Sequence, residues 1–460
     1  MPQITLKDYL RESRLFKHRA ITAAAGIFVL VTFLALRLVQ LQITDHEHFT
    51  TLSQDNRVKV QPLPPTRGLI YDRSGVLLAQ NLPAHSLEII PERVGDLEKT
   101  LDQLSKIITI TESDRKRFQR LRKQRRRFDS IPIRLRLEED EVARFAINRH
   151  RFPGVDIQAK LLRDYPLGAE TAHVLGYVGR ISEKELQVID ESNYSGTTYI
   201  GKNGIEKTYE AQLHGEVGLQ QVEVNALGRV IRVLENQPPR PGDDLYLTLD
   251  SQLQAVAMAA FGEENGSAVA IDPQTGNVLA LVSKPGFNPN LFVEGISPTD
   301  YRELQHSPDK PLFNRALRGQ YPPGSTVKPF IGLAGLESGT VYYHQKKYCP
   351  GYYQLPNLSH KYRDWKKTGH GAVDLEDAII QSCDVYYYDL AYQMGIDKIQ
   401  SFMSRFGFGE RTGIDITGEL PGLMPSRAWK KKRRRAPWYP GETLITGIGQ
   451  GYFLTTPLQL

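Results

Sequence analysis

The chain has 460 residues, enough for roughly two to four domains. A hydrophobic fraction of 40% and a charged fraction of 24% are typical of a globular protein, and two cysteines are too few for a disulfide scaffold. The net charge of +6 is a mild basic excess, which would suit a phosphate-bearing ligand or an anionic membrane surface without establishing either.

The first predicted element is a membrane anchor. Residues 20–36 carry no charge, and the apolar run continues past Arg37, whose long side chain can reach the interface. Cationic residues precede the run, so we expect a cytoplasmic tail at 1–19 and a single span at 20–41. A cleavable signal peptide is the alternative, but no clear small-x-small site follows. The remaining chain should face outward, which excludes ATP, cytosolic metabolites and chromosomal DNA as partners.

Residues 42–240 form a polar region that contains three Gly-rich segments, at 67–81, 175–182 and 201–218. The first of them, RGLIYDRSGVLLAQN, predicts a strand, a turn and a second strand. The apolar spacing at 97–107 and 138–147 predicts amphipathic helices. This region is therefore expected to mix helices and strands.

A Pro/Gly-rich linker near residue 240 precedes a change of pattern in residues 241–460. A helical segment beginning at Ser251 leads into residues 266–283, where two apolar runs around Pro-Gln-Thr-Gly-Asn predict a hairpin. Helical patterns follow at 328–336, 375–394 and 396–406. The order predicts an α+β domain with helices packed on an antiparallel sheet.

A candidate nucleophile lies in YPPGSTVKPF, residues 321–330. Ser325 stands at a predicted helix start, and Lys328 follows three residues later on the same face. A serine hydroxyl needs a neighbouring base to become a good nucleophile, and a lysine can serve when its surroundings lower its pKa. The alternative is that Ser325 caps the helix and Lys328 is a solvated side chain.

Further motifs resemble those of the class B penicillin-binding proteins, the membrane-anchored D,D-transpeptidases that cross-link peptidoglycan. Ser325 and Lys328 match the Ser-x-x-Lys motif, and Ser382-Cys383-Asp384 matches the Ser-x-Asn motif with Asp384 in place of Asn. RGLIYDRSG and GKNGIEKTYE resemble pedestal signatures of the family. The Asp variant is most similar to the penicillin-binding protein 2 group of the elongation machinery.

The resemblance implies a non-catalytic pedestal, dimerisation-like, at 42–240 and a transpeptidase domain at 241–460. Ser325 would attack a stem peptide and form an acyl-enzyme, Lys328 would take the proton, and Ser382 and Asp384 would relay protons and order the site. β-Lactams would trap Ser325. The implied location is the bacterial inner membrane, with the transpeptidase domain in the periplasm, and the implied partner is a RodA-like polytopic glycosyltransferase with other elongation proteins.

The Lys-Thr-Gly motif of this family is expected after the Ser-x-Asn motif, on the strand that lines the catalytic groove. In this chain Lys367-Thr368-Gly369, within WKKTGHG, precedes Ser382, and no other copy follows before Leu460. We therefore interpret Lys367-Thr368-Gly369 as unrelated to catalysis and the transpeptidase domain as carboxy-terminally truncated. The resemblance leads us to expect weak or absent turnover from the chain as given.

Two thiols, a carboxylate and an imidazole surround WKKTGHG: Cys349, Asp364, His370 and Cys383. Such a set suits a closed tetrahedral zinc site, and a Cys349–Cys383 disulfide or two unrelated thiols are the alternatives. The resemblance favours a structural zinc, because some members of the penicillin-binding protein 2 group have one close to these positions. His360 is a possible substitute ligand.

Two basic runs, at 122–127 and 430–435, are most simply solvated faces. They could instead contact anionic lipid headgroups or the pyrophosphate of a lipid-linked glycan, whereas nucleic acid is excluded by the topology. The alternatives to an elongation transpeptidase are a non-catalytic scaffold that activates a membrane glycosyltransferase, a lactam sensor, and the division-specific transpeptidase.

Overall fold

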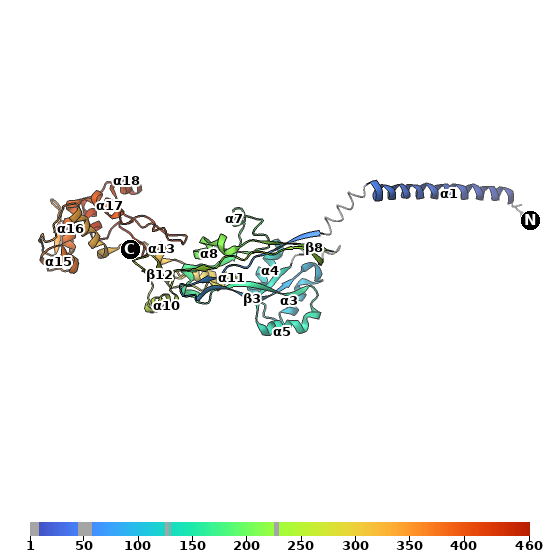
Figure 1. Cartoon of the computed structure of the whole chain (residues 1–460), viewed down its shortest axis with the longest axis horizontal. Helices are drawn as coiled ribbons and strands as arrows, with labels where there is room; N and C mark the ends of the chain where they lie inside the picture. The colour runs from blue at the N-terminus through green and yellow to red at the C-terminus, as the bar shows by residue number, and fades with distance from the viewer. Residues whose placement is uncertain (1–8, 45–57, 125–127, 129, 225–229) are drawn as a thin grey trace, which may run out of the picture. The chain divides into compact units, whose positions relative to one another are not determined.

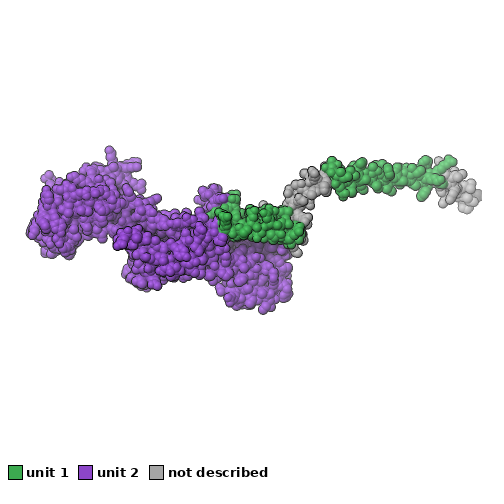
Figure 2. Space-filling model, in the orientation of Figure 1, with its two compact units in different colours: residues 1–65, 191–196, 216–240 green, residues 66–190, 197–215, 241–460 purple. Residues whose placement is uncertain are grey.

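A computed structural model of the chain describes residues 9–44, 58–124, 128, 130–224 and 230–460. The chain divides into two compact units, which Figure 2 colours separately. Unit 1 comprises residues 1–65, 191–196 and 216–240, and unit 2 comprises residues 66–190, 197–215 and 241–460. Mixed helices and sheets confirm the predicted α+β class.

Unit 1 holds the anchor helix and a small sheet. Helix α1 (Tyr9–Val39) continues as a π-helical turn, η1 (Gln40–Thr44). Within the described residues, the segment Ser13–Thr44 is the one helix long and apolar enough to cross a membrane. The sheet is antiparallel in the order β1-β8-β9, with bounds β1 (Val58–Leu63), β8 (Gly218–Val224) and β9 (Val230–Gln237).

The first part of unit 2 is a five-stranded sheet built around a long strand, β3. Strand β3 pairs antiparallel with β2, β4 and β5, while β10 runs parallel to β2. The strands are β2 (Ile70–Tyr71), β3 (Leu77–Ile89), β4 (Ile131–Leu137), β5 (Val155–Asp164) and β10 (Leu245–Tyr246). As the sequence predicts, a turn joins β2 and β3: the Asp72 carboxylate accepts the N–H groups of Ser74 and Val76.

Three helices bury apolar side chains in the core cluster that also contains residues of β3 and β4. They are α3 (Leu97–Leu104), α4 (Glu112–Gln124) and α5 (Glu139–Asn148), two of which lie where the sequence predicts helices. Phe118 and Phe145 are fully buried in this core. Residues 125–127 of the first basic run lie outside the described residues.

Short elements connect this sheet to the rest of unit 2. They are η2 (Pro91–Arg93), η3 (Arg149–Arg151), η4 (Gly168–Glu170), α6 (Ala172–Leu175), β6 (Val178–Arg180), α7 (Glu183–Leu186), β7 (Tyr199–Gly201), α8 (Gly204–Thr208) and α9 (Glu210–His214). Glu206 of α8 is fully buried and accepts hydrogen bonds from Arg67, Arg163 and Tyr165. It thereby joins two of the Gly-rich segments, because Arg67 belongs to the first and Glu206 to the third.

The remaining elements follow β10 in the chain, and Figure 1 shows them in yellow to red. The hairpin is β11 (Gly266–Ile271) and β12 (Val278–Lys284), paired antiparallel as predicted, with α10 (Ser251–Ala260) in contact with β12. The other elements are α11 (Asn290–Val293), α12 (Pro298–His306), α13 (Arg315–Arg318), η5 (Gly324–Val327), α14 (Lys328–Glu337), β13 (Lys347–Cys349), β14 (Tyr352–Gln354), β15 (Lys361–Arg363), β16 (Gly371–Val373), α15 (Leu375–Ile380), α16 (Asp384–Met394), α17 (Ile396–Ser404), α18 (Arg427–Arg434) and α19 (Pro440–Gly447).

Helix α16 is the centre of the helical cluster. It contacts α14, α15, α17 and α19, and seven of its eleven residues are buried. Tyr386 and Tyr387 are among the largest fully buried side chains of the protein. A helix buried on nearly all sides gives a rigid base for the residues at its amino-terminal end, which are Cys383 and Asp384.

Candidate active site

Ser325 lies in the short 3-10 turn η5 that leads directly into α14. Pro329 occupies the first turn of α14, where the missing N–H has no intrahelical partner to lose. Ser325 is exposed, whereas Lys328 is only 2% exposed. The turn therefore presents a hydroxyl to solvent and sends the amine into the protein.

The amine of Lys328 donates hydrogen bonds to Ser382 and Asp384. Its Nζ lies 2.9 Å from the backbone oxygen of Ser382, 3.1 Å from Ser382 Oγ and 2.7 Å from Asp384 Oδ1. The ring of Tyr387 faces the same nitrogen at 5.4 Å, and burial raises the pKa of Tyr387, so this phenol stays neutral. The ammonium is thus paired and hydrogen-bonded, as a buried charge must be.

Ser382 connects the amine to the nucleophile candidate. Ser382 Oγ donates to Ser325 Oγ at 3.0 Å, so the path from Lys328 to Ser325 runs through Ser382. Among the hydrogen bonds of the described residues, none joins Lys328 Nζ directly to Ser325 Oγ. The structure brings together all four residues that the sequence analysis selected for catalysis, although the direct approach of Lys328 to Ser325 is replaced by this relay.

The backbone at Ser382 differs from the sequence prediction. Residues 375–394 were expected to form one helix, but α15 ends at Ile380 and α16 begins at Asp384. Ser382 has φ +52°, a left-handed conformation that is unfavourable for a residue with a side chain. The break directs Ser382 Oγ toward Ser325, which an unbroken helix would not do.

A second backbone segment supports Ser325 from the far end of the chain. Gly324 donates its N–H to the backbone oxygen of Gly449 at 2.8 Å. A Cβ on Gly449 would meet the backbone oxygen of Gly324 at 2.1 Å, and Gly449 has φ +70°. Only glycine fits there.

The four residues chosen as metal ligands also form a cluster. The ligand atoms of Cys349, Asp364, His370 and Cys383 all lie within 4.8 Å of one another. Asp364 Oδ2 is 3.6 Å from Cys349 Sγ and 3.5 Å from Cys383 Sγ, and Asp364 Oδ1 is 3.6 Å from His370 Nδ1. Both cysteines are free and buried, and His360 is exposed and outside the cluster.

The two sulfur–oxygen distances to Asp364 Oδ2, and the 3.6 Å between Cys349 Sγ and His370 Nδ1, fit a tetrahedral zinc ion. With Zn–S of about 2.3 Å, Zn–N of about 2.0–2.1 Å and Zn–O of about 2.0–2.2 Å, the edges of a tetrahedron measure about 3.4–3.6 Å between unlike ligands. The donor set of two sulfurs, one nitrogen and one oxygen is also one that zinc accepts. In the protein alone, burial raises the pKa of the Cys383 thiol.

WKKTGHG is a loop that contributes His370 to this cluster and directly follows Asp364. Lys367-Thr368-Gly369 lies between β15 and β16, with a turn in which Gly369 donates its N–H to Lys366. A Cβ on Gly369 would meet the backbone oxygen of Cys349 at 2.1 Å, so glycine lets the loop approach β13. The loop places Asp364 and His370 opposite Cys349.

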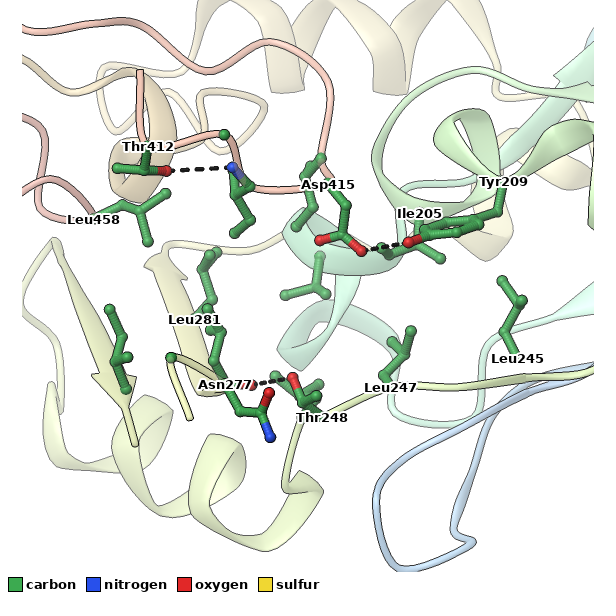
Figure 3. A pocket seen from close by; sticks show the side chains of 18 of the residues that line it. Ile205, Tyr209, Leu245, Leu247, Thr248, Asn277, Leu281, Thr412, Asp415 and Leu458 are labelled. Carbon is green, nitrogen blue, oxygen red and sulfur yellow. Dashed lines mark hydrogen bonds between the residues drawn. The ribbon is translucent and has the colours of Figure 1, made fainter. Parts of the chain in front are cut away.

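A pocket elsewhere in unit 2 shares no lining residue with the Ser325 cluster. It has a volume of about 580 Å³ and is mainly apolar, with Tyr209 donating to Asp415 on one wall (Figure 3). A cavity of this volume therefore does not mark the candidate catalytic residues, which are identified by the hydrogen bonds among Ser325, Ser382 and Lys328.

Comparison with known proteins identifies the class. The family model of the penicillin-binding protein dimerisation domain matches residues 62–247, and that of the penicillin-binding protein transpeptidase domain matches residues 266–460. Together with the site geometry, this shows that the chain belongs to the class B penicillin-binding proteins.

Several relatives within that class are of the penicillin-binding protein 2 type. Peptidoglycan D,D-transpeptidase MrdA of Escherichia coli (strain K12) is 45% identical over 462 residues, which cover 100% of this chain and 73% of that protein. The crystal structure of Pseudomonas aeruginosa PBP2 in complex with WCK 5153 shares 45% identity, with a TM-score of 0.66 and coverage of 87% of this chain and 68% of that one. The complex between PBP2 and MreC from Helicobacter pylori contains a chain 35% identical, with a TM-score of 0.75 and coverage of 87% and 76%.

Proposed function

We propose that the protein is a peptidoglycan D,D-transpeptidase of cell-wall elongation that works through an acyl-enzyme on Ser325 and is inhibited by β-lactams. Its relatives support the activity, and one observation supports the serine mechanism: the hydrogen-bonded path from Ser325 Oγ through Ser382 Oγ to Lys328 Nζ. An exposed hydroxyl linked to a buried amine is what a serine nucleophile needs.

In the first step Ser325 Oγ bonds to the carbonyl carbon of the penultimate D-alanine, and the peptide bond to the terminal D-alanine breaks. The step starts from the neutral amine of Lys328. Both hydroxyls can turn, so Ser325 gives its proton to Ser382 while Ser382 gives its own proton to Lys328, which becomes the ammonium. The proton then goes to the departing amine. In the second step an amine of a neighbouring stem peptide attacks the ester and restores the Ser325 hydroxyl.

This function is tested by release of D-alanine from a synthetic stem pentapeptide, using membranes of cells that express the protein from its own gene. We expect Ser382→Ala to lower the rate by about 10²–10⁴-fold, because proton transfer in the transition state contributes that much. Ser338→Ala, which removes a hydroxyl at the end of α14, is the matched control. Release that is equal in Ser382→Ala and wild type would exclude the relay.

We also infer that Cys349, Asp364, His370 and Cys383 hold a structural zinc ion. Four protein ligands leave no open position, so bound zinc supplies bracing rather than catalysis. Asp364 accepts the N–H of Val385, and Cys383 stands between the two site residues Ser382 and Asp384. The cluster therefore holds the start of α16 in place beside Lys328.

Metal analysis of the purified protein tests the zinc proposal. We expect about one zinc per chain, and less than half of that in Cys349→Ser, with a lower unfolding temperature after chelation. A zinc-free protein lighter by two hydrogens would instead support the disulfide.

We further propose that the amino terminus is cytoplasmic, that residues 42–240 are a pedestal, and that the protein works with a RodA-like glycosyltransferase. Arg14, Lys17 and Arg19 lie in α1 before the uncharged run 20–36, on the side that the positive-inside rule places in the cytoplasm. A peptide tag at the amino terminus should resist protease added outside spheroplasts, which tests the orientation. Purification of the protein through the same tag should also recover the glycosyltransferase, which tests the partnership. Cleavage of the tag from outside would contradict this orientation.

A further inference from the structure

The second basic run of the sequence lies in the carboxy-terminal half of α18, labelled in Figure 1, and ends at Arg435 directly after the helix. Its exposed residues are called the basic face below. Lys431, Lys432, Arg433, Arg434 and Arg435 are all exposed. No acidic side chain of the described residues forms an ion pair with any of these five. Cations in the last turn of a helix interact favourably with its dipole, so this charge is compatible with a stable α18. Its exposure leaves it available to an anionic ligand.

The remaining side of α18 is fixed to the protein. Lys430 is 3% exposed, forms an ion pair with Glu442 of α19, and lies 4.4 Å from the ring centre of Tyr439. Ser426 caps the helix by accepting the N–H of Trp429 at 3.1 Å. The orientation of the basic face is therefore set by buried contacts.

The basic face is also connected to the nucleophile segment. The Trp429 and Tyr452 rings are 5.1 Å apart, and the Arg434 guanidinium lies 5.9 Å from the Tyr452 ring. Tyr452 follows Gly449 by three residues, and Gly449 is the acceptor for Gly324, the neighbour of Ser325. The segment from Gly449 to Tyr452 therefore contacts α18 at one end and the residue before Ser325 at the other.

We propose that this basic face binds the free carboxylates of peptidoglycan stem peptides and so recruits the glycan strand to Ser325. The inference rests on the proposed transpeptidase function, because stem peptides are the substrate at Ser325 and carry free carboxylates. Exposed charges on the rim of a site act mainly by steering and by raising the association rate. Their reach is about 8 Å at physiological salt, so binding should weaken as salt rises.

Binding of soluble, uncross-linked peptidoglycan strands to the detergent-solubilised protein, measured over a salt series, tests the proposal. We expect the triple variant Lys431→Gln, Lys432→Gln, Arg433→Gln to bind about tenfold more weakly at low salt, with the difference shrinking at high salt. Strands whose carboxylates are converted to amides should bind the wild type about tenfold more weakly as well.

Two matched variants complete the design. Arg120→Gln, Arg122→Gln, Lys123→Gln removes the same charge from exposed positions of α4 and should keep wild-type affinity. The charge-keeping variant Lys431→Arg, Lys432→Arg, Arg433→Lys should also bind as the wild type does, which shows that binding depends on charge rather than on the particular side chains. An unchanged unfolding temperature of the Gln variant excludes a folding defect at α18.

The proposal would be overturned if the Gln variant of α18 bound strands as tightly as the wild type does. It would also be overturned if the wild type bound amidated strands as tightly as unmodified strands. A variant that loses affinity for vesicles of anionic phospholipid but not for strands would overturn it as well, because the face would then serve a membrane. A wild type that binds strands through α18 yet releases no D-alanine from the stem pentapeptide would refute the transpeptidase function alone.

Discussion

The buried carboxylate of Glu206 is expected to be among the costliest side chains to change outside the site. Its two oxygens lie 2.7 Å from Nε of Arg67 and 2.7 Å from Nε of Arg163, and the Tyr165 hydroxyl donates to it at 3.1 Å. Arg163 is 2% exposed at its side chain. Glu206→Gln would leave this guanidinium without its counter-charge, and breaking such a buried pair costs about 3–5 kcal/mol.

Urea unfolding measures this loss as a lower midpoint at an unchanged slope. The matched control is Asp140→Asn on α5, which breaks an exposed pair: Arg144 and Asp140 are 52% and 69% exposed and 2.8 Å apart. That control should cost less than about 1 kcal/mol. If Glu206→Gln lost as little unfolding free energy as the control does, burial would not make this ion pair costly to break.

The same carboxylate predicts a pH dependence. Burial alone would raise the pKa of Glu206, but Arg67 and Arg163 hold it below its ordinary value of 4.5. Its stabilising contribution is therefore present above pH 4.5 and is lost as pH falls through the lowered folded-state pKa. The difference in unfolding free energy between wild type and Glu206→Gln should be constant at neutral pH and shrink in acid.

Three further results are expected. Burial lowers the pKa of His173 from 6.5 to about 4, so between those values only the unfolded chain gains a proton on this side chain. The contribution of His173 to the unfolding free energy should therefore fall by about 3 kcal/mol from pH 7 to pH 4, and His173→Phe should remove this part of the pH profile in urea titrations. Lys328→Met should lower the rate of penicillin acylation by about 10²–10⁴-fold. It should also lower the unfolding temperature, because it leaves the Asp384 carboxylate without its counter-charge. Gly449→Ala should lower the unfolding free energy more than Gly395→Ala in urea titrations, because both glycines have positive φ but only Gly449 meets backbone, at Gly324, where the Cβ would lie.

Much of the fold was predictable because its signals are local. The turn after Asp72, the hairpin of β11 and β12, and α14 follow from turn residues and helical spacing within a few positions. The helix break at Ser382 was not predictable, because apolar and aromatic residues continue the helical pattern across it. Its positive φ depends on contacts with Lys328, 54 residues earlier in the chain.

The candidate site was predictable as a set of residues but not as a geometry. The three-residue spacing predicted that the amine of Lys328 would approach Ser325. In the structure the amine instead donates hydrogen bonds to Ser382 and Asp384. Gly449 and the Tyr387 ring were missed as neighbours of the site, since their roles arise only when distant segments meet. For the same reason, sequence alone gave no indication that Arg67 and Glu206 would meet.

The most direct test of the central claim is to locate a penicillin adduct by mass spectrometry, in membranes of cells that express the protein from its own gene. The account predicts one adduct, on Ser325, that is absent in Ser325→Ala and present in Ser338→Ala. An adduct on any other residue, or equal labelling of Ser325→Ala and wild type, would contradict the account.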